Sequence, residues 1–456
     1  MLFNSLPFLL FFAVVYAVYR RLPHRGQNAW LLASSWFFYG WWDWRFLSLI
    51  AASTAVDFVC GKRVAADRAR GGRWVLLSVL VNLGILATFK YYGWFADEVT
   101  AFFDVVDVPL YLPAVDLVLP VGLSFYTFQS MAYTIDVWRG RDPCERPLDF
   151  ALFVSFFPQL VAGPIERSER LLPQITEPRT LKREQLAEGM HLLVWGFFKK
   201  VFVADNLAVI VDRAYAGGQP GGLTVLLAAY AFTWQIYCDF SGYSSIARGL
   251  AKLLGVELSV NFRLPLFADS PRDLWRRWHI SLSQWLRDYL YIPLGGSRSG
   301  RVGLNLIATM VLGGLWHGAN WTFVIWGLLH GLALAAHRAL AGRVPVPRWL
   351  AVVATFHLTV LGFLIFRAAD VGQAAALLSA LPWMAAGGED LRAAARLLVL
   401  VAPVLVIELA MWLRGSDLGL LMKLPRAAQA VLIAVMVALT LMLGATSGQA
   451  FLYFQF

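Results

Sequence analysis

Cysteine and charge are both scarce in this chain of 456 residues, and each shortage excludes a class of protein. The three cysteines, Cys60, Cys144 and Cys238, lie far apart and form no C-x-x-C or other metal-ligand spacing. Neither a disulfide framework nor a metal site is therefore indicated. No internal repeat, low-complexity tract or soluble domain is visible either.

Charged residues make up only 15% of the chain, whereas hydrophobic residues make up 59% and the mean hydropathy is +0.61. These values are typical of an integral membrane protein rather than a soluble one. The formal net charge of +10 would elsewhere suggest nucleic acid. Here the lysines and arginines stand in short loops between apolar runs, where they are topology signals. We therefore expect a multi-pass protein that contacts membrane lipid and binds no nucleic acid.

The apolar runs predict an all-α protein with about 11 membrane segments, some of them short or broken. The run at residues 150–162 is only about two-thirds of the roughly 20 residues that a spanning helix needs, and Gly163 and Pro164 end it. We expect that run to be re-entrant or broken. The runs lie at residues 6–19, 30–42, 46–60, 74–95, 113–137, 150–162, 191–215, 223–254, 304–316, 321–337, 350–366, 397–413 and 428–443, with an ambiguous patch at 377–386.

Histidines, glycines and tryptophans crowd together between Ser270 and Gly331. Ser270 can N-cap a helix, Pro271 suits its first turn and Asp273 completes a capping-box spacing. Continued at 100° per residue, that helix places His279 on an aromatic face. Residues 263–301 are therefore expected to form an amphipathic segment at the cytoplasmic interface. The face consists of Trp275, Trp278, Leu282, Trp285, Leu286 and Tyr289.

A second histidine, His317, lies in the run G-G-L-W-H-G-A-N-W. The glycines around it allow a non-helical backbone or the close approach of another segment. Because residues 304–316 are too short to cross a bilayer fully, His317 is expected inside the membrane, where protein or a water-filled cavity must surround it. Asp239 also lies near membrane depth, where a carboxylate costs roughly 2.5–3.5 kcal/mol, so it must face a cavity or a partner.

Six further strings accompany the two histidine runs, and together they cover essentially the whole chain. With them the sequence resembles the membrane-bound O-acyltransferases, and within that family the bacterial branch that acetylates alginate. The A-N-W string and the aromatic ending resemble that branch more closely than the D-alanyl branch. The strings are F-K-Y-Y-G-W-F (89–95), L-P-V-G-L-S-F-Y-T-F-Q (119–129), F-P-Q-L-V-A-G-P-I (157–165), W-G-F-F-K-K (195–200), Y-C-D-F-S-G-Y-S (237–244) and F-L-Y-F-Q-F (451–456).

The resemblance implies one membrane domain over residues 1–456, with helices around a mid-membrane chamber and the catalytic region at residues 302–337. It makes His317 the catalytic histidine and His279 the family's other histidine. A neutral imidazole can act as a general base on a hydroxyl or take the acyl group itself. Asn320 is a candidate to orient His317. The residues expected to line the chamber are Asp239, Tyr243, Trp316, Asn320 and Trp278.

The implied reaction takes acetyl from a cytoplasmic thioester, acetyl-CoA, with no bound cofactor, and passes it across a bacterial inner membrane to an exported alginate-like polysaccharide. Because no extracytoplasmic domain able to hold a polymer is visible, a periplasmic acetyltransferase or a polysaccharide-export protein is the expected partner. Peptidoglycan, cellulose and teichoic acid are alternative acceptors.

Several readings of the residues stay open beside this one. Polar residues and short helices near the midplane also suit a transporter, and a non-catalytic scaffold of a polymer-export complex is a third reading. His279 could be an interfacial histidine with a satisfied hydrogen bond. Arg263, Arg276 or Arg277 could attract an anionic nucleotide donor.

Overall fold

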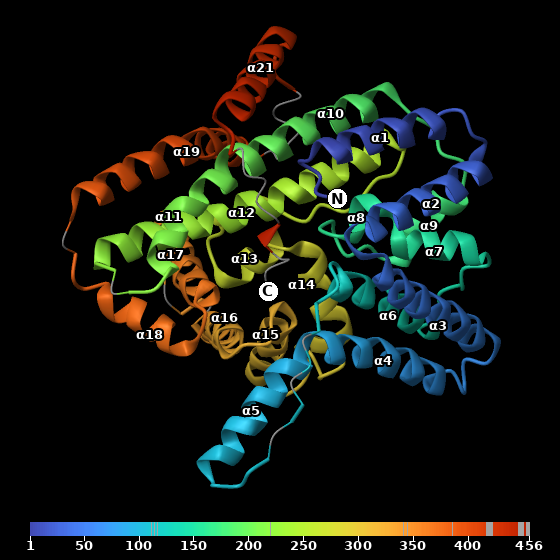
Figure 1. Ribbon diagram of the computed structural model, residues 1–456, viewed down its shortest axis with the longest axis horizontal. Helices are drawn as coiled ribbons and strands as arrows, with labels where there is room; N and C mark the ends of the chain where they lie inside the picture. The colour runs from blue at the N-terminus through green and yellow to red at the C-terminus, as the bar shows by residue number, and fades with distance from the viewer. Residues whose placement is uncertain are drawn as a thin grey trace. The chain divides into compact units, whose positions relative to one another are not determined.

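The computed structural model is helical wherever it has regular structure among the described residues, so the all-α prediction is confirmed (Figure 1). It describes residues 1–456 apart from 111, 114, 116, 219, 341, 344, 385, 416–422, 446–450 and 453–456. The end of the aromatic string at 451–456 therefore lies outside the described residues beyond Leu452. Contacts group the chain into two compact units, residues 1–182 with 251–258 and residues 183–250 with 259–456.

Helices that are long and apolar enough to cross a membrane occur in both units. Seven helical stretches in the described part of the chain are long and apolar enough to cross a membrane, and three shorter apolar helices accompany them. The prediction of a polytopic fold that includes short helices is confirmed. The seven stretches are His24–Ala66, Gly72–Val105, Gly222–Leu253, Trp321–Leu340, Arg348–Arg367, Gly388–Leu413 and Arg426–Leu443, and the shorter helices are Leu6–Tyr19, Val302–His317 and Val371–Ala380.

In the first unit, α3, α4 and α6 pack against one another around the buried carboxylate of Asp57. Hydroxyl and amide groups from Ser78, Asn82, Ser130 and Thr134 donate to that carboxylate. A charge removed from water is tolerated there because donors surround it. The helices of this unit are α1 (Leu6–Tyr19), α2 (His24–Asp43), η1 (Trp44–Phe46), α3 (Leu47–Ala66), α4 (Gly72–Leu86), η2 (Ala87–Tyr91), α5 (Tyr92–Val105), α6 (Leu123–Trp138), α7 (Pro147–Ser155), α8 (Phe157–Leu160) and α9 (Ser168–Thr176).

One predicted segment of this unit is wrong in its extent, and another is confirmed. The run at 113–137 is helical only from Leu123. Gly122 precedes it at φ +75°, and a Cβ there would lie 2.6 Å from the carbonyl oxygen of Leu160, so a tight approach to another segment fixes the start. The run at 150–162 is broken, as predicted, because the chain turns at Phe156 between α7 and α8.

The second unit holds both histidine runs. Its helices are α10 (Arg183–Phe197), η3 (Phe198–Ala204), α11 (Asp205–Tyr215), α12 (Gly222–Leu253) as far as Leu250, η4 (Pro265–Phe267), α13 (Pro271–Arg277), α14 (Ile280–Leu286), η5 (Arg287–Tyr291), α15 (Val302–His317), α16 (Trp321–Leu340), α17 (Arg348–Arg367), α18 (Val371–Ala380), α19 (Gly388–Leu413) and α21 (Arg426–Leu443).

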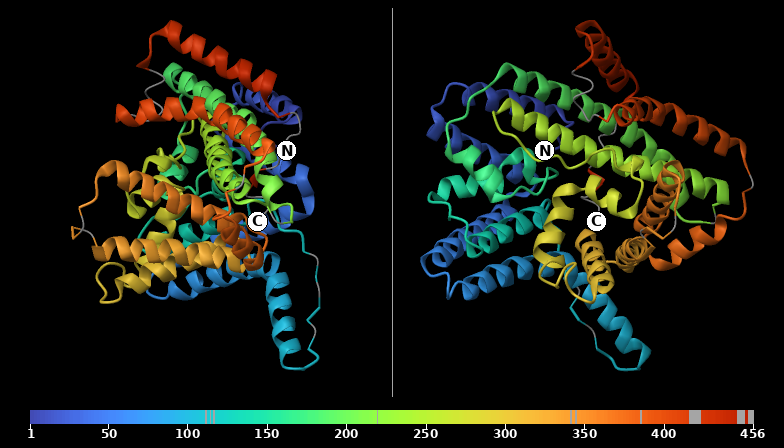
Figure 2. Two further views of the ribbon diagram at one scale, coloured as in Figure 1. Left: turned by 90° about the vertical axis from the view of Figure 1, so that its left-hand side faces the viewer. Right: turned by 180° about the vertical axis from the view of Figure 1, so that it is seen from behind.

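Glycines bring two pairs of helices in this unit into backbone contact. A Cβ on Gly196 of α10 would lie 2.7 Å from the carbonyl oxygen of Gly242 of α12, and the two helices run side by side in Figures 1 and 2. A Cβ on Gly314 of α15 would lie 2.1 Å from the carbonyl oxygen of Phe323 of α16. Small residues permit this close packing of membrane helices. The glycines beside His317 thus serve the close approach of a second helix.

The amphipathic helix predicted to run on from Ser270 is wrong in its continuity. Its start is confirmed, because the Ser270 side chain accepts a hydrogen bond from the Asp273 amide at 3.2 Å and Pro271 occupies the first turn. The helix ends at Arg277, however, and α14 begins anew at Ile280. Trp278 and His279 form the break, so the single aromatic face does not exist as drawn from periodicity.

Candidate active site

His317 is the last residue of α15, whose helical backbone continues through it and ends at Gly318. Its side chain is buried, with 5% exposed, and three aromatic rings surround it. The ring centroids lie 5.1 Å from Trp316, 5.1 Å from Trp326 and 5.4 Å from Phe366. Since all three rings meet the imidazole at steep angles, they hold its plane as well as its position.

His279 occupies the break between α13 and α14 in a left-handed conformation, with φ +42°. Its Nδ1 accepts a hydrogen bond from the Leu282 amide at 3.4 Å and so caps α14. An accepting Nδ1 assigns the proton of the neutral ring to Nε2. The side chain is 1% exposed, and burial lowers the pKa of His279 to about 3. The ring is therefore neutral at physiological pH.

Asn261 holds this unusual backbone in place, and sequence reasoning missed it. Its carbonyl oxygen accepts from the Ile280 amide at 2.9 Å, and its side-chain oxygen accepts from the amide and hydroxyl of Ser281 at 3.2 and 3.0 Å. Three bonds from one buried asparagine satisfy the start of α14 and so allow a non-glycine residue at positive φ. An isolated asparagine between two apolar segments gives no periodic signal from which this role could have been predicted.

Trp316 connects the two histidines. Its ring centroid lies 5.1 Å from that of His317 and 5.9 Å from that of His279, although the histidines are far apart in sequence. We refer to His279, Trp316 and His317 as the histidine cluster. The structure thus brings both predicted histidines into contact with one buried indole.

Trp278 and Phe240 complete the aromatic surroundings of His279. The Phe240 ring of α12 lies 4.6 Å from His279, and Phe262 lies between, 6.5 Å from His279 and 5.2 Å from Trp278. Trp278 is 3% exposed and also contacts Phe363 of α17 at 5.1 Å. Trp278 therefore packs in the core beside the histidine cluster, through Phe262, and Phe240 is a neighbour of His279 that the sequence did not single out.

Asp239 and Tyr243 belong to a different group of side chains. The Lys200 ammonium lies 2.6 Å from Asp239 and 2.7 Å from Asp205, and all three side chains are buried. The Tyr243 ring lies 5.3 Å from the same ammonium. We refer to Lys200, Asp205, Asp239 and Tyr243 as the lysine–aspartate cluster. Asp239 also accepts from the Leu452 amide at 2.8 Å, so its carboxylate is a buried anchoring point for the chain.

Asn320 lies in the turn between α15 and α16. Its side-chain nitrogen donates to the carbonyl oxygen of Ala369 at 2.7 Å, and its side-chain oxygen accepts from the Thr322 amide at 3.0 Å. These bonds cap the start of α16 and tie the turn to the residues that follow α17. The geometry thus gives Asn320 a role in placing the turn after His317, and its part in orienting the imidazole stays a prediction.

Most of the chain is similar in sequence to proteins of one known family. The sequence model of the membrane-bound O-acyltransferase family matches residues 145–349. A protein named probable alginate O-acetylase AlgI from Azotobacter vinelandii is 45% identical over 386 residues, which cover 82% of this chain and 76% of the relative. The protein of the same name from Pseudomonas putida is 43% identical over 390 residues, covering 84% and 80%. This chain belongs to the membrane-bound O-acyltransferase family.

A relative with a different named activity is less similar. The peptidoglycan O-acetyltransferase of Helicobacter pylori is 34% identical over 382 residues, which cover 76% of this chain and 72% of the relative. As a membrane-bound O-acyltransferase, the chain is an acyl-transferring enzyme that passes through the membrane several times. The residues that match the family model, 145–349, include both His279 and His317.

The arrangement around His317 suits acyl transfer to a hydroxyl group. A neutral imidazole can accept the hydroxyl proton as the oxygen attacks a carbonyl carbon. The aromatic frame excludes water, which would otherwise compete as the acceptor. Among the described residues, histidine, cysteine, aspartate and glutamate side chains form no group of three or more able to hold a metal ion.

Proposed function

We propose that this membrane-bound O-acyltransferase takes acetyl from acetyl-CoA on the cytoplasmic side and passes it across the membrane for O-acetylation of an exported, alginate-like polysaccharide. The observation that carries the proposal is the histidine cluster, in which a buried imidazole ends a short apolar helix and shares contact with Trp316 with a second imidazole. Its support from relatives is the 45% identity to a probable alginate O-acetylase.

His317 is the proposed general base. The acceptor oxygen attacks the thioester carbonyl carbon while His317 removes the hydroxyl proton. The carbon–oxygen bond forms, the carbon–sulfur bond breaks, and the proton returns from the imidazole to the leaving thiolate. A base in this position contributes about 10²–10⁴-fold to the rate. The same imidazole could instead carry the acetyl group briefly before the acceptor takes it.

The same comparison supports the proposed acceptor, and the bacterial inner membrane is the proposed location. Identity is 45% to a probable alginate O-acetylase and 34% to a peptidoglycan O-acetyltransferase, so an alginate-like polymer is favoured over peptidoglycan. Teichoic acid is less favoured, because the teichoic acid D-alanyltransferase of Bacillus subtilis is only 28% identical over 285 residues. A polymer exported by a bacterium meets this enzyme at the inner membrane. A periplasmic acetyltransferase or a polysaccharide-export protein is the proposed partner, because the polymer needs a protein surface beyond the membrane helices.

Release of free CoA from acetyl-CoA by the purified protein tests the proposal. The unmodified chain is expected to release CoA, and His317→Ala is expected to reduce release by about 10²-fold or more. His357→Ala is the matched control, because His357 is exposed on α17 and, among the described residues, its ring forms hydrogen bonds with Tyr230 and Val353 only. Only variants that remain monodisperse in detergent are compared.

The same preparation in liposomes separates the enzyme from a transporter. Thioester cleavage that depends on His317 supports the enzyme. Solute flux with no cleavage by any form would overturn the proposal. If the polymer and a periplasmic partner are supplied and His317→Ala still supports full acetylation, the chain acts as a scaffold and the proposed role of His317 is wrong.

A further inference from the structure

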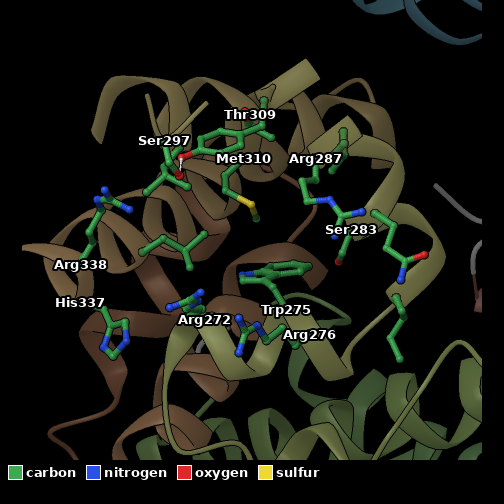
Figure 3. A pocket seen from close by; sticks show the side chains of 16 residues that line it. Arg272, Trp275, Arg276, Ser283, Arg287, Ser297, Thr309, Met310, His337 and Arg338 are labelled. Atoms are coloured by element: carbon green, nitrogen blue, oxygen red, sulfur yellow. Dashed lines mark hydrogen bonds between the residues drawn. The ribbon is translucent and has the colours of Figure 1, made fainter. Parts of the chain in front are cut away.

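The first unit contains a cavity whose charge is opposite to that of a cavity in the second. The second unit's cavity is lined by four arginines, Arg272, Arg276, Arg287 and Arg338 (Figure 3). The first unit's cavity has a volume of about 590 Å³ and is lined by the loop after α6 and by residues of α7 and α9. Its volume falls in the range of small-molecule sites. None of the residues assigned to acyl transfer is among its 13 described lining residues, so it is a separate feature of the fold.

Carboxylates outnumber cations in the wall of the first unit's cavity. Five of its described lining residues are acidic and two are basic, although the whole chain carries a formal net charge of +10. Glu169 pairs with Arg141, and Glu145 pairs with Lys62. Like charges around one hollow repel one another, and a bound cation removes that repulsion. The carboxylates of the wall that form no ion pair with any described residue belong to Asp142, Asp149 and Glu177.

Asp149 is the buried carboxylate of this group. Its side chain lies in the first turn of α7 and is 3% exposed. Its Oδ1 accepts a hydrogen bond from the side-chain nitrogen of Asn28 in α2 at 2.8 Å, and the same nitrogen donates to the carbonyl oxygen of Ile175 at 2.9 Å. Its Oδ2 is buried and has no hydrogen-bond partner among the described residues. A buried carboxylate oxygen without a donor is costly, so a ligand that donates to Oδ2 is stabilised there.

Hydrogen bonds hold the loop after α6 in place as a wall of the cavity. The amide of Cys144 donates to the hydroxyl of Tyr133 in α6 at 3.0 Å. The guanidinium of Arg68 donates to the carbonyl oxygens of Gly140 and Arg141 at 3.2 and 3.3 Å. A wall that is already fixed costs a ligand little ordering on binding.

The remaining lining side chains select the kind of cation. None of the described lining residues is aromatic, whereas quaternary ammonium ligands are recognised by aromatic faces. Pro143, Leu172 and Pro173 add apolar surface, which suits the methylene groups of an alkyl chain. Histidine, cysteine, aspartate and glutamate side chains in the described part of the chain form no group of three or more able to hold a metal ion. This composition fits primary ammonium groups on a flexible alkyl chain.

We propose that this cavity binds an alkylammonium ligand with two or more ammonium groups, for which a free linear polyamine is the simplest source. One ammonium group donates to the Oδ2 of Asp149, and the others neutralise Asp142 and Glu177. The methylene groups between them pack on Leu172. Lysine side chains of a second protein carry the same chemistry on the same kind of arm. The inference goes beyond the proposed function, because it depends on neither the acyl donor nor the acceptor.

Binding of spermidine to the purified full chain in an uncharged detergent is the first test. The unmodified chain is expected to bind spermidine in calorimetry, and its melting temperature is expected to rise with spermidine concentration, because the ligand binds the folded state. Asp149→Asn keeps an acceptor for Asn28 but loses the charge, and it is expected to bind about tenfold or more weakly. Asp67→Asn is the matched control: it makes the same change at an exposed residue of the same unit that does not line the cavity.

A second variant decides the question if Asp149→Asn fails to fold. Asp142 and Glu177 are both exposed, so the Asp142→Asn, Glu177→Gln double variant is expected to keep the fold. Its affinity for spermidine is expected to fall about threefold or more, because two exposed charges are lost. Unchanged affinity in this double variant, or in a folded Asp149→Asn, would overturn the inference.

Other probes test the chemistry and the source of the ligand. Mg²⁺ at matched ionic strength is expected to give little stabilisation. If Mg²⁺ stabilises the chain as much as spermidine does and Asp149→Asn abolishes both effects, the cavity responds to charge alone and the alkylammonium assignment is wrong. A tetralysine peptide that binds in place of spermidine, with the same dependence on Asp149, would assign the site to a lysine-bearing partner. Spermidine binding that the peptide does not displace would assign it to a free polyamine, and binding of neither would refute the proposal.

Discussion

Two buried polar groups in the second unit, the histidine cluster and the lysine–aspartate cluster, are built in opposite ways. The first consists of two imidazoles and an indole, with the Trp316 ring in contact with both His279 and His317. The second consists of formal charges, with the Lys200 ammonium within 2.7 Å of both Asp205 and Asp239. The two clusters meet on α12. Asp239 belongs to the lysine–aspartate cluster, and the next residue, Phe240, contacts His279 of the histidine cluster at 4.6 Å.

The difference shows how structure and chemistry divide the buried polar residues. A buried carboxylate that already has an ammonium and a backbone amide as partners is anchored and has little left to offer a substrate. An imidazole framed by rings keeps its proton chemistry, because rings restrict its orientation without neutralising it. The histidine cluster is therefore the one suited to acyl transfer, and the lysine–aspartate cluster is suited to holding the fold.

His317→Asn is expected to have the largest effect, a loss of about 10²–10⁴-fold in CoA release with little change in thermal unfolding. Asparagine keeps a polar group at the end of α15 but cannot accept the hydroxyl proton. Activity and melting temperature, measured on the same sample, check this. Retention of more than a tenth of the activity would contradict the assignment of His317 as the base.

Asp239→Ala is expected to do the reverse, lowering the free energy of unfolding by about 3–5 kcal/mol because a buried pair loses one partner. Denaturant or thermal unfolding in detergent gives this value. Glu389→Ala is the control, because it removes one member of an exposed pair with Arg213, at 2.8 Å, and should change stability far less. If Asp239→Ala is fully stable but inactive, the division of roles between the clusters is wrong.

His279 both caps α14 and contacts Trp316, so substitutions of this residue separate its effect on stability from its effect on acyl transfer. Asparagine tolerates its positive φ and can cap α14, whereas alanine does neither, so His279→Ala is expected to be less stable than His279→Asn by about 1–2 kcal/mol. Comparative unfolding checks that difference. CoA release is expected to fall in both variants because the ring against Trp316 is lost. Full activity in His279→Asn would reduce His279 to a helix cap.

A smaller effect is expected from pH. Burial lowers the pKa of His279 from 6.5 to about 3, so the unfolded chain takes up a proton first as pH falls. The stability from this residue is complete above pH 6.5 and is lost as pH falls toward 3, by less than about 1 kcal/mol between pH 7 and 6. Unfolding at the two pH values, compared with His279→Asn, measures it. An equal slope in the variant would assign the dependence to other groups.

Much of the fold was predictable because it depends on local pattern. The apolar runs predicted most of the spans, and the shortness of the run that Gly163 and Pro164 end predicted the broken segment. Ser270 and Pro271 announced the start of α13. The end of that helix was not predictable, because the apolar periodicity continues through His279. The break is stabilised by hydrogen bonds that Asn261, which precedes α13 in the chain, accepts from Ile280 and Ser281.

The candidate site divides in the same way. The two histidine runs were recognisable as strings, but the partners of Asp239 were not, because Lys200 and Leu452 are distant in sequence. From the sequence, Arg276 and Arg277 could equally be topology signals or ligand-binding residues. The structure distinguishes them, because Arg277 pairs with Asp273 whereas Arg276 has no ion pair among the described residues.

By itself, the sequence determined that this is an all-α membrane protein of the O-acyltransferase family and that His317 ends a short apolar helix beside glycines. Hydropathy and helical spacing depend on near neighbours, so they can be read along the chain. Only the tertiary structure decided that Trp316 contacts both His317 and His279 and that Lys200 pairs with Asp205 and Asp239. These contacts arise from helices packed through their glycines, and no local pattern encodes which faces meet.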